Sequence, residues 1–238
     1  MRPINKGDWP LKGNSNTKRK VFVDWTRAIK DLVNRTGTYC HFCEMRVTNA
    51  LAIEHLLPQE HYPERSGDWD NFLLTCSYCN SHKSATIPIN PYTVHYVWPH
   101  LNNTLLAVDY TLVGEVVPKR NLGPDSFEYE RAQNIIALYG LDKTTTSSGD
   151  SDTRWTERAD AIVMAVTRRA EFNRGINNSV DAIIDLARKT GFFSIWLKIF
   201  NDVAAVRDAI IQCPDFHVPV AECFDAQLNL ITRSANDI

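Results

Sequence analysis

The sequence predicts an α+β protein in which a small metal-binding unit is followed by a mainly helical region. Two C-x-x-C pairs, at residues 40–43 and 76–79, lie in a region of mixed strand and helix patterns. Further along the chain, apolar residues recur at helical spacing in segments that glycines separate. We therefore expect an N-terminal α+β unit over residues 1–142, a Ser/Thr/Gly-rich linker over 143–152 and a helical region over 153–238.

The N-terminal unit opens with a predicted amphipathic helix over residues 21–34, whose apolar residues recur at intervals close to 3.6. Gly37 is placed to end this helix. Residues 38–56 predict a β-hairpin, and Pro58 stops its second strand. A short apolar run, 72–74, then leads into a predicted short helix at 77–84.

The rest of the sequence predicts one further hairpin followed by several helices. Gly114 marks the bend of the hairpin, and Gly140 suits the C-terminal cap of the helix that follows it. The predicted hairpin spans 105–117, the predicted helices span 126–139, 153–173, 179–189 and 192–212, and a last apolar stretch spans 218–231.

Composition and charge exclude several classes of protein. The 238 residues are 44% hydrophobic and 23% charged, which is ordinary for a globular chain and excludes a wholly disordered one. The longest apolar run, 192–200, is far shorter than the roughly 20 residues that span a membrane. The N-terminus has no signal-peptide pattern, so we expect a cytoplasmic protein without a membrane partner.

The charge is unevenly distributed along the chain. The net formal charge is −2, which is too low for a protein that coats nucleic acid nonspecifically. Residues 1–39 nevertheless carry nine Lys and Arg against three Asp and Glu, whereas residues 40–90 carry three against six. A basic segment therefore adjoins an acidic one.

The four paired cysteines predict a structural zinc site. Without a secretion signal disulfides are not expected, and each C-x-x-C pair places two thiolates on one tight turn. Four thiolates form a closed tetrahedral Zn²⁺ site with no open position for catalysis. His41 is an alternative ligand that a full set of thiols makes unnecessary. The predicted ligands are Cys40, Cys43, Cys76 and Cys79.

The segment between and after the pairs resembles the HNH endonuclease superfamily. The resembling string is C-x-x-C, then Glu54-His55-x-x-Pro58, then Asn71-x-Leu-Leu-x-C-x-x-C-Asn80-x-x-Lys83. The resemblance implies a ββα-metal core braced by a zinc knuckle over about residues 38–90. It also implies a protein that hydrolyses phosphodiester bonds.

The resemblance further implies roles for the site residues. His55 would act as the general base, with its imidazole oriented by the side-chain amide of Asn71. Glu54 and Asn80 would hold one catalytic Mg²⁺ or Mn²⁺ through oxygen atoms.

Two further residues bear on this site. Lys83, one helical turn after Asn80, would contact phosphate. His82 is a rival to Asn80 as the third residue of the site. Because successive strand residues face opposite sides, Glu54 and His55 share one site only if the strand ends or bulges there.

A narrower resemblance, to the HNH subunits of Septu and related retron defence systems, comes from several short motifs. These motifs are Met1-Arg2-Pro3, Asp68-Trp69-Asp70-Asn71, Cys79-Asn80-Ser81, Ala132-Gln133-Asn134-Ile135 and Leu141-Asp142. The resemblance implies a prokaryotic antiphage nuclease that works with an ATPase subunit, docked on the helical region. DNA is the favoured substrate. The alternatives are a nuclease of RNA such as tRNA, and a zinc-braced binding or adaptor module that does not cut.

Overall fold

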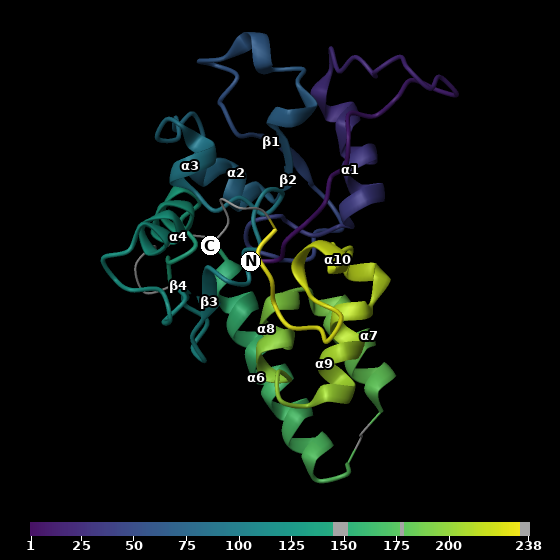
Figure 1. The fold of residues 1–238 in the computed structure, drawn as a ribbon, viewed down its shortest axis with the longest axis vertical. Coiled ribbons are helices and arrows are strands. Elements are labelled where there is room, and N and C mark those ends of the chain that lie inside the picture. Colours follow the sequence, from purple (N-terminus) through teal and green to yellow (C-terminus); the bar gives the residue numbers. More distant parts are fainter. Residues whose placement is uncertain (145–151, 177–178, 234–238) are drawn as a thin grey trace.

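A computed structural model describes residues 1–144, 152–176 and 179–233 of the chain (Figure 1). Most of the expected linker, 143–152, lies outside the described residues. The strands are β1 (Ala52–His55), β2 (Phe72–Thr75), β3 (Val108–Tyr110) and β4 (Val116–Pro118). The α-helices are α1 (Ala28–Thr36), α2 (Ser77–Lys83), α3 (Tyr92–His95), α4 (Phe127–Leu138), α6 (Arg154–Asn173), α7 (Val180–Thr190), α8 (Phe193–Ile199), α9 (Ala204–Gln212) and α10 (Val220–Cys223).

The first helix begins later than predicted. A 3₁₀ turn, η1 (Trp25–Arg27), follows the N-cap residue Asp24 and leads into α1. Residues 21–24 precede the helix because Phe22 is buried in a small core, while Val21 and Val23 point to solvent. The end of the helix is confirmed at Gly37, whose φ of 75° suits a residue without a side chain.

The predicted hairpin over 38–56 is wrong. β1 pairs antiparallel with β2, which comes later in the chain, in the register Glu54 to Leu73 and His55 to Phe72. Residues 39–46 instead form a tight knuckle, closed by an isolated bridge between Tyr39 and Arg46 and by the Cys40 N–H bond to the Met45 carbonyl.

The strand pair and the helix after it confirm the ββα arrangement. α2 follows β2 directly and contacts β1. The second hairpin, β3 and β4, is confirmed with Gly114 in its bend, and so is α4, which Ser126 caps through the Tyr129 N–H. In Figure 1 the ββα elements and α1 occupy the upper part of the molecule.

The C-terminal region is helical, as predicted, and its helices α6 to α9 form the lower part of Figure 1. The single helix expected over 192–212 is divided into α8 and α9, which pack against each other after a turn near Asn201. α6 packs against α8. In the part of the chain that the structure describes, no helix is both long and apolar enough to cross a membrane.

One hydrophobic core joins the two regions. The cluster that contains Phe42 and the four paired cysteines continues through Tyr139 to Trp196 and Phe200. Glu44 connects them further: its buried carboxylate accepts hydrogen bonds from the Tyr110 hydroxyl and the Ser194 N–H. The helical region therefore packs directly against the knuckle, while the division into separate units stays a prediction.

Candidate active site

The four paired cysteines form one buried cluster. Their sulfur atoms all lie within 4.8 Å of one another, and the Sγ atoms of Cys43 and Cys76 are 3.7 Å apart. Thiolates held about 2.3 Å from one tetrahedral zinc ion stand roughly 3.8 Å apart, so the cluster fits zinc. The two other cysteines, Cys213 and Cys223, lie outside this cluster.

The surroundings of the cluster leave no role for His41 as a ligand. Its Nδ1 accepts a hydrogen bond from the Leu74 N–H, and its Nε2 lies 2.8 Å from the Thr36 hydroxyl. Both ring nitrogens are therefore used to join β2 to the end of α1. This arrangement agrees with a zinc site made of sulfur alone.

Arg154, the first residue of α6, lies against the cluster. Its buried guanidinium donates to Cys79 Sγ at 3.2 Å and to the carbonyls of Tyr139 and Gly140. Four thiolates around Zn²⁺ carry a net charge of −2, which is costly to bury without a nearby cation. Arg154 supplies such a cation from outside the N-terminal unit, although its guanidinium is also paired with the Asp152 carboxylate at 2.7 Å, which offsets part of its charge.

His55 ends β1, with only 9% of its surface exposed. Its ring packs edge-on against Trp25 and Phe72, at centroid distances of 5.5 and 5.2 Å. Its Nε2 lies 3.1 Å from the Ser66 carbonyl oxygen. A carbonyl can only accept, so Nε2 carries the hydrogen and Nδ1 keeps the lone pair of a base. Burial lowers the pKa of His55, and the hydrogen bond to the Ser66 carbonyl acts in the opposite direction.

Glu54 and Lys83 form a buried ion pair on the other side of β1. The Lys83 ammonium is fully buried, 2.8 Å from Glu54 Oε1, and it also donates to the His55 carbonyl at 2.8 Å. Burial raises the pKa of Glu54 to about 7, and Lys83 acts in the opposite direction. Contact with phosphate needs an accessible ammonium, so the buried Lys83 does not fit the phosphate contact predicted for it, and its contacts are with Glu54 and the His55 backbone.

Asn71 is fully buried but does not contact His55 as expected. Its Oδ1 accepts from the Leu57 N–H at 2.8 Å, and its Nδ2 donates to the carbonyls of Leu57 and Arg65. The amide thus closes the loop between β1 and β2. Since Arg65 precedes Ser66, Asn71 contacts the backbone next to the carbonyl that lies against His55.

An open pocket of about 380 Å³ brings the predicted residues together. Glu54 and His55 both line it, because β1 ends at His55 and the pocket lies at that end of the strand. Asn80, exposed on α2, lines it as well. His82 lines a different pocket and directs its ring toward Gly140, so the geometry favours Asn80 as the third residue.

Sequence reasoning missed three parts of these sites. The Ser66 carbonyl has no residue-type signal, because every residue carries a backbone oxygen. Trp25, which forms one wall of the His55 pocket, has a residue type that is also common in ordinary core packing. Arg154 comes 75 residues after Cys79, and a basic residue at a helix start opposes the helix dipole, which was the one available signal.

Comparisons with known proteins agree with this geometry. Residues 38–86 match the family model described as HNH endonuclease, and this part of the chain is therefore an HNH endonuclease domain. The chain is also similar to the Septu protein PtuB of Bacillus thuringiensis, with 32% identity over 57 residues. That match covers 23% of this chain and 22% of the relative, so it spans less than a quarter of either protein.

Proposed function

We propose that this protein is a metal-dependent nuclease that hydrolyses phosphodiester bonds of DNA, as part of a prokaryotic antiphage system. The single observation that carries the proposal is the His55 ring, with its Nε2 held against the Ser66 carbonyl, in one pocket with Glu54 and Asn80. The HNH domain and the similarity to a Septu protein support the nuclease activity and the defence role.

His55 would remove the proton from the attacking water through Nδ1, because Nε2 already donates to Ser66. The oxygen atoms of Glu54 and Asn80 suit a hard cation such as Mg²⁺ or Mn²⁺. A cation bound there supplies positive charge to the phosphate and to the leaving 3′ oxygen. Lys83 orients Glu54 and holds the His55 backbone, so it keeps the base and the carboxylate in register.

The test is digestion of supercoiled plasmid by the purified full chain, with Mg²⁺ or Mn²⁺, beside a His55→Ala variant. A general base contributes roughly 10²–10⁴-fold to the rate, so the variant should lose that much cleavage with fold and zinc content unchanged. Single-stranded DNA and tRNA are run in parallel. If tRNA is cleaved faster than DNA, RNA replaces DNA as the proposed substrate. If plasmid, single-stranded DNA and tRNA all stay intact, an adaptor without nuclease activity is favoured.

The ATPase partner implied by the Septu resemblance belongs to the same proposal, with its docking site on the helical region. α6 presents Val163 and Val166 to solvent, 66% and 44% exposed. Deleting residues 153–238 would also remove Arg154 and half of the shared core, so point changes are the sharper test. Val163→Asp with Val166→Asp should abolish co-purification with the ATPase, whereas Arg120→Ala on the N-terminal region should not.

A further inference from the structure

Residues 9–20 form an ordered hairpin-like loop, which we name the basic finger. Its two sides are joined by the Lys12 N–H bond to the Lys18 carbonyl, at 2.7 Å, and by the Lys20 N–H bond to Pro10. The Trp9 indole closes its base by donating to the Lys20 carbonyl at 2.8 Å. These bonds fix the course of the loop backbone.

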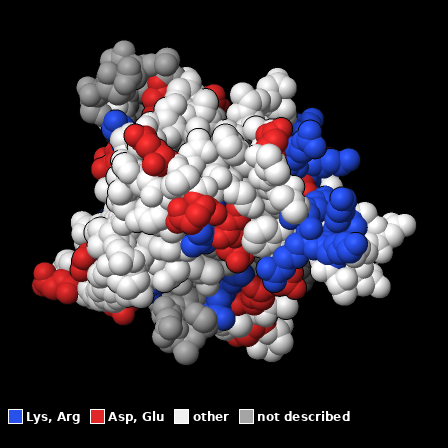
Figure 2. Space-filling view, turned by 90° about the horizontal axis from the view of Figure 1, so that it is seen from above, with Lys and Arg blue, Asp and Glu red and all other residues white. Residues whose placement is uncertain are grey.

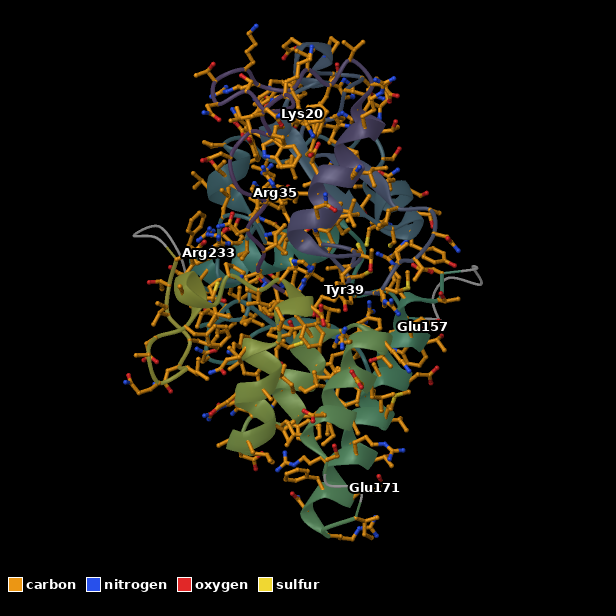
Figure 3. The ribbon with its side chains drawn as sticks, turned by 90° about the vertical axis from the view of Figure 1, so that its right-hand side faces the viewer. Lys20, Arg35, Tyr39, Glu157, Glu171 and Arg233 are labelled. Atoms are coloured by element: carbon orange, nitrogen blue, oxygen red, sulfur yellow. The ribbon has the colours of Figure 1, made fainter. Side chains whose placement is uncertain are left out.

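The finger carries cations that the protein does not neutralise. Lys12, Lys18 and Arg19 are exposed, and no ion pair with a carboxylate of the described residues involves them. Arg19 instead lies over the Trp9 ring, 5.3 Å from its centroid. Lys20 differs, because it is paired with Asp31. Figure 2 shows Lys and Arg gathered on one side of this end of the molecule, and Figure 3 labels Lys20 at the same end.

The finger is joined rigidly to the His55 pocket. Directly after it, Phe22 is buried against Trp69 and Phe72, at centroid distances of 6.0 and 5.9 Å. Trp25 then contacts His55 and lines the pocket. Arg19, the unpaired cation of the finger nearest to Trp25 in sequence, comes six positions before it, so their Cα atoms lie at most about 22 Å apart. The finger therefore leads directly into a segment that lines the pocket.

We propose that the basic finger binds the phosphate backbone of the nucleic acid whose phosphodiester enters the His55 pocket. This proposal rests on the proposed function. The chain as a whole is acidic, so a local cluster of unpaired cations is its means of attracting a polyanion by counterion release. At roughly 3.4 Å per base pair, 22 Å corresponds to about six base pairs, so Arg19 would contact the backbone within about that distance of the cut.

The test measures binding rather than cleavage, with full-length chains that carry His55→Ala. A fluorescent 20-base-pair DNA duplex, the single strand and an RNA duplex of the same sequence serve as probes, titrated at several salt concentrations. The finger variant carries Lys12→Ala, Lys18→Ala and Arg19→Ala. The matched control removes three exposed cations elsewhere, with Arg120→Ala, Arg174→Ala and Lys189→Ala.

The finger variant should bind duplex DNA at least about tenfold more weakly than the control, with a salt slope smaller by up to roughly 0.9 for each lost phosphate contact. Equal binding of the finger variant and the control to all three probes would overturn the proposal. The probe that shows the largest loss identifies the nucleic acid. If the finger variant binds more weakly than the control but the chain with His55 intact cleaves none of the nucleic acids, the proposed function is refuted. The finger then remains a nucleic-acid-binding site.

Discussion

The zinc cluster and the His55 pocket meet on one short helix, yet they are built in opposite ways. Cys79 of α2 belongs to a cluster in which every ligand is buried, whereas Asn80, the next residue, is exposed on an open pocket. A buried site with four sulfur ligands leaves no room for substrate. An open site with oxygen ligands leaves room for both water and phosphate.

The cysteine cluster and the His55 pocket therefore have separate energetic roles. Zinc bound by the cluster would contribute to the folding free energy, while the pocket would hold its ion weakly and exchange it. Because the helix is shared, the position of the cysteine cluster determines where Asn80 and Lys83 stand. Loss of a cysteine ligand should therefore affect both the cluster and the pocket, whereas a change in the pocket should affect the pocket alone.

The largest effect is expected from Cys40→Ser. Structural zinc contributes about 10–16 kcal/mol of apparent binding free energy in small zinc modules, so loss of one ligand should release zinc and unfold the shared core. Elemental analysis and thermal melting measure both outcomes. A variant that melts cooperatively near the wild-type temperature without zinc would contradict the assignment.

The matched treatment of the pocket is brief chelation with EDTA. Cleavage should stop and return on addition of Mg²⁺ or Mn²⁺, with one zinc per chain retained throughout. Loss of zinc at the same rate as loss of activity would mean that the cluster and the pocket do not hold their metals separately.

The next effect concerns the buried ion pair. Lys83→Met leaves the Glu54 carboxylate buried without its partner, which should lower the free energy of unfolding by about 3–5 kcal/mol. Adding Glu54→Gln removes the unpaired charge and should restore much of that loss. Urea unfolding measures each variant, and Lys189→Met, at an exposed site, is the control. A loss as small as that of the control would show that the pair contributes little.

A smaller effect is expected from Asn71→Ala. Three hydrogen bonds disappear, and the Leu57 N–H is left without its acceptor, at a cost of about 1–3 kcal/mol. Since the loop presents Ser66 to His55, the cleavage rate per folded molecule should fall as well. If stability falls and that rate does not, Asn71 supports only the loop.

Arg154→Ala tests the contact between the helical region and the cluster. Partners of metal ligands typically contribute 10–100-fold in metal affinity, so competition with a chelator should show zinc held that much more weakly. Arg154→Lys keeps the positive charge, so its zinc affinity should lie between those of the wild type and Arg154→Ala. Arg174→Ala, at the other end of α6, is the control. Unchanged zinc affinity would reduce Arg154 to a fold-stabilising residue.

Turns and helices that are encoded by residues close together in the chain could be predicted from the sequence. Two C-x-x-C pairs predict a four-thiolate cluster because each pair encodes its own turn, and the helices α2, α4, α6 and α7 follow from periodicity and caps. The likeness of Glu54-His55 and Asn80 to HNH motifs predicted a site on segments that share one pocket in the structure.

Tertiary structure alone decided the contacts that join distant segments. The pairing of β1 with β2, the Ser66 carbonyl at His55, the burial of Lys83 against Glu54 and the approach of Arg154 to Cys79 all depend on packing. Backbone carbonyls are present at every residue, and a lysine or arginine has the same letter whether it is solvated or buried. Spacing along the chain therefore predicts which residues form a turn or a helix, but not which backbone atom or distant cation completes a site.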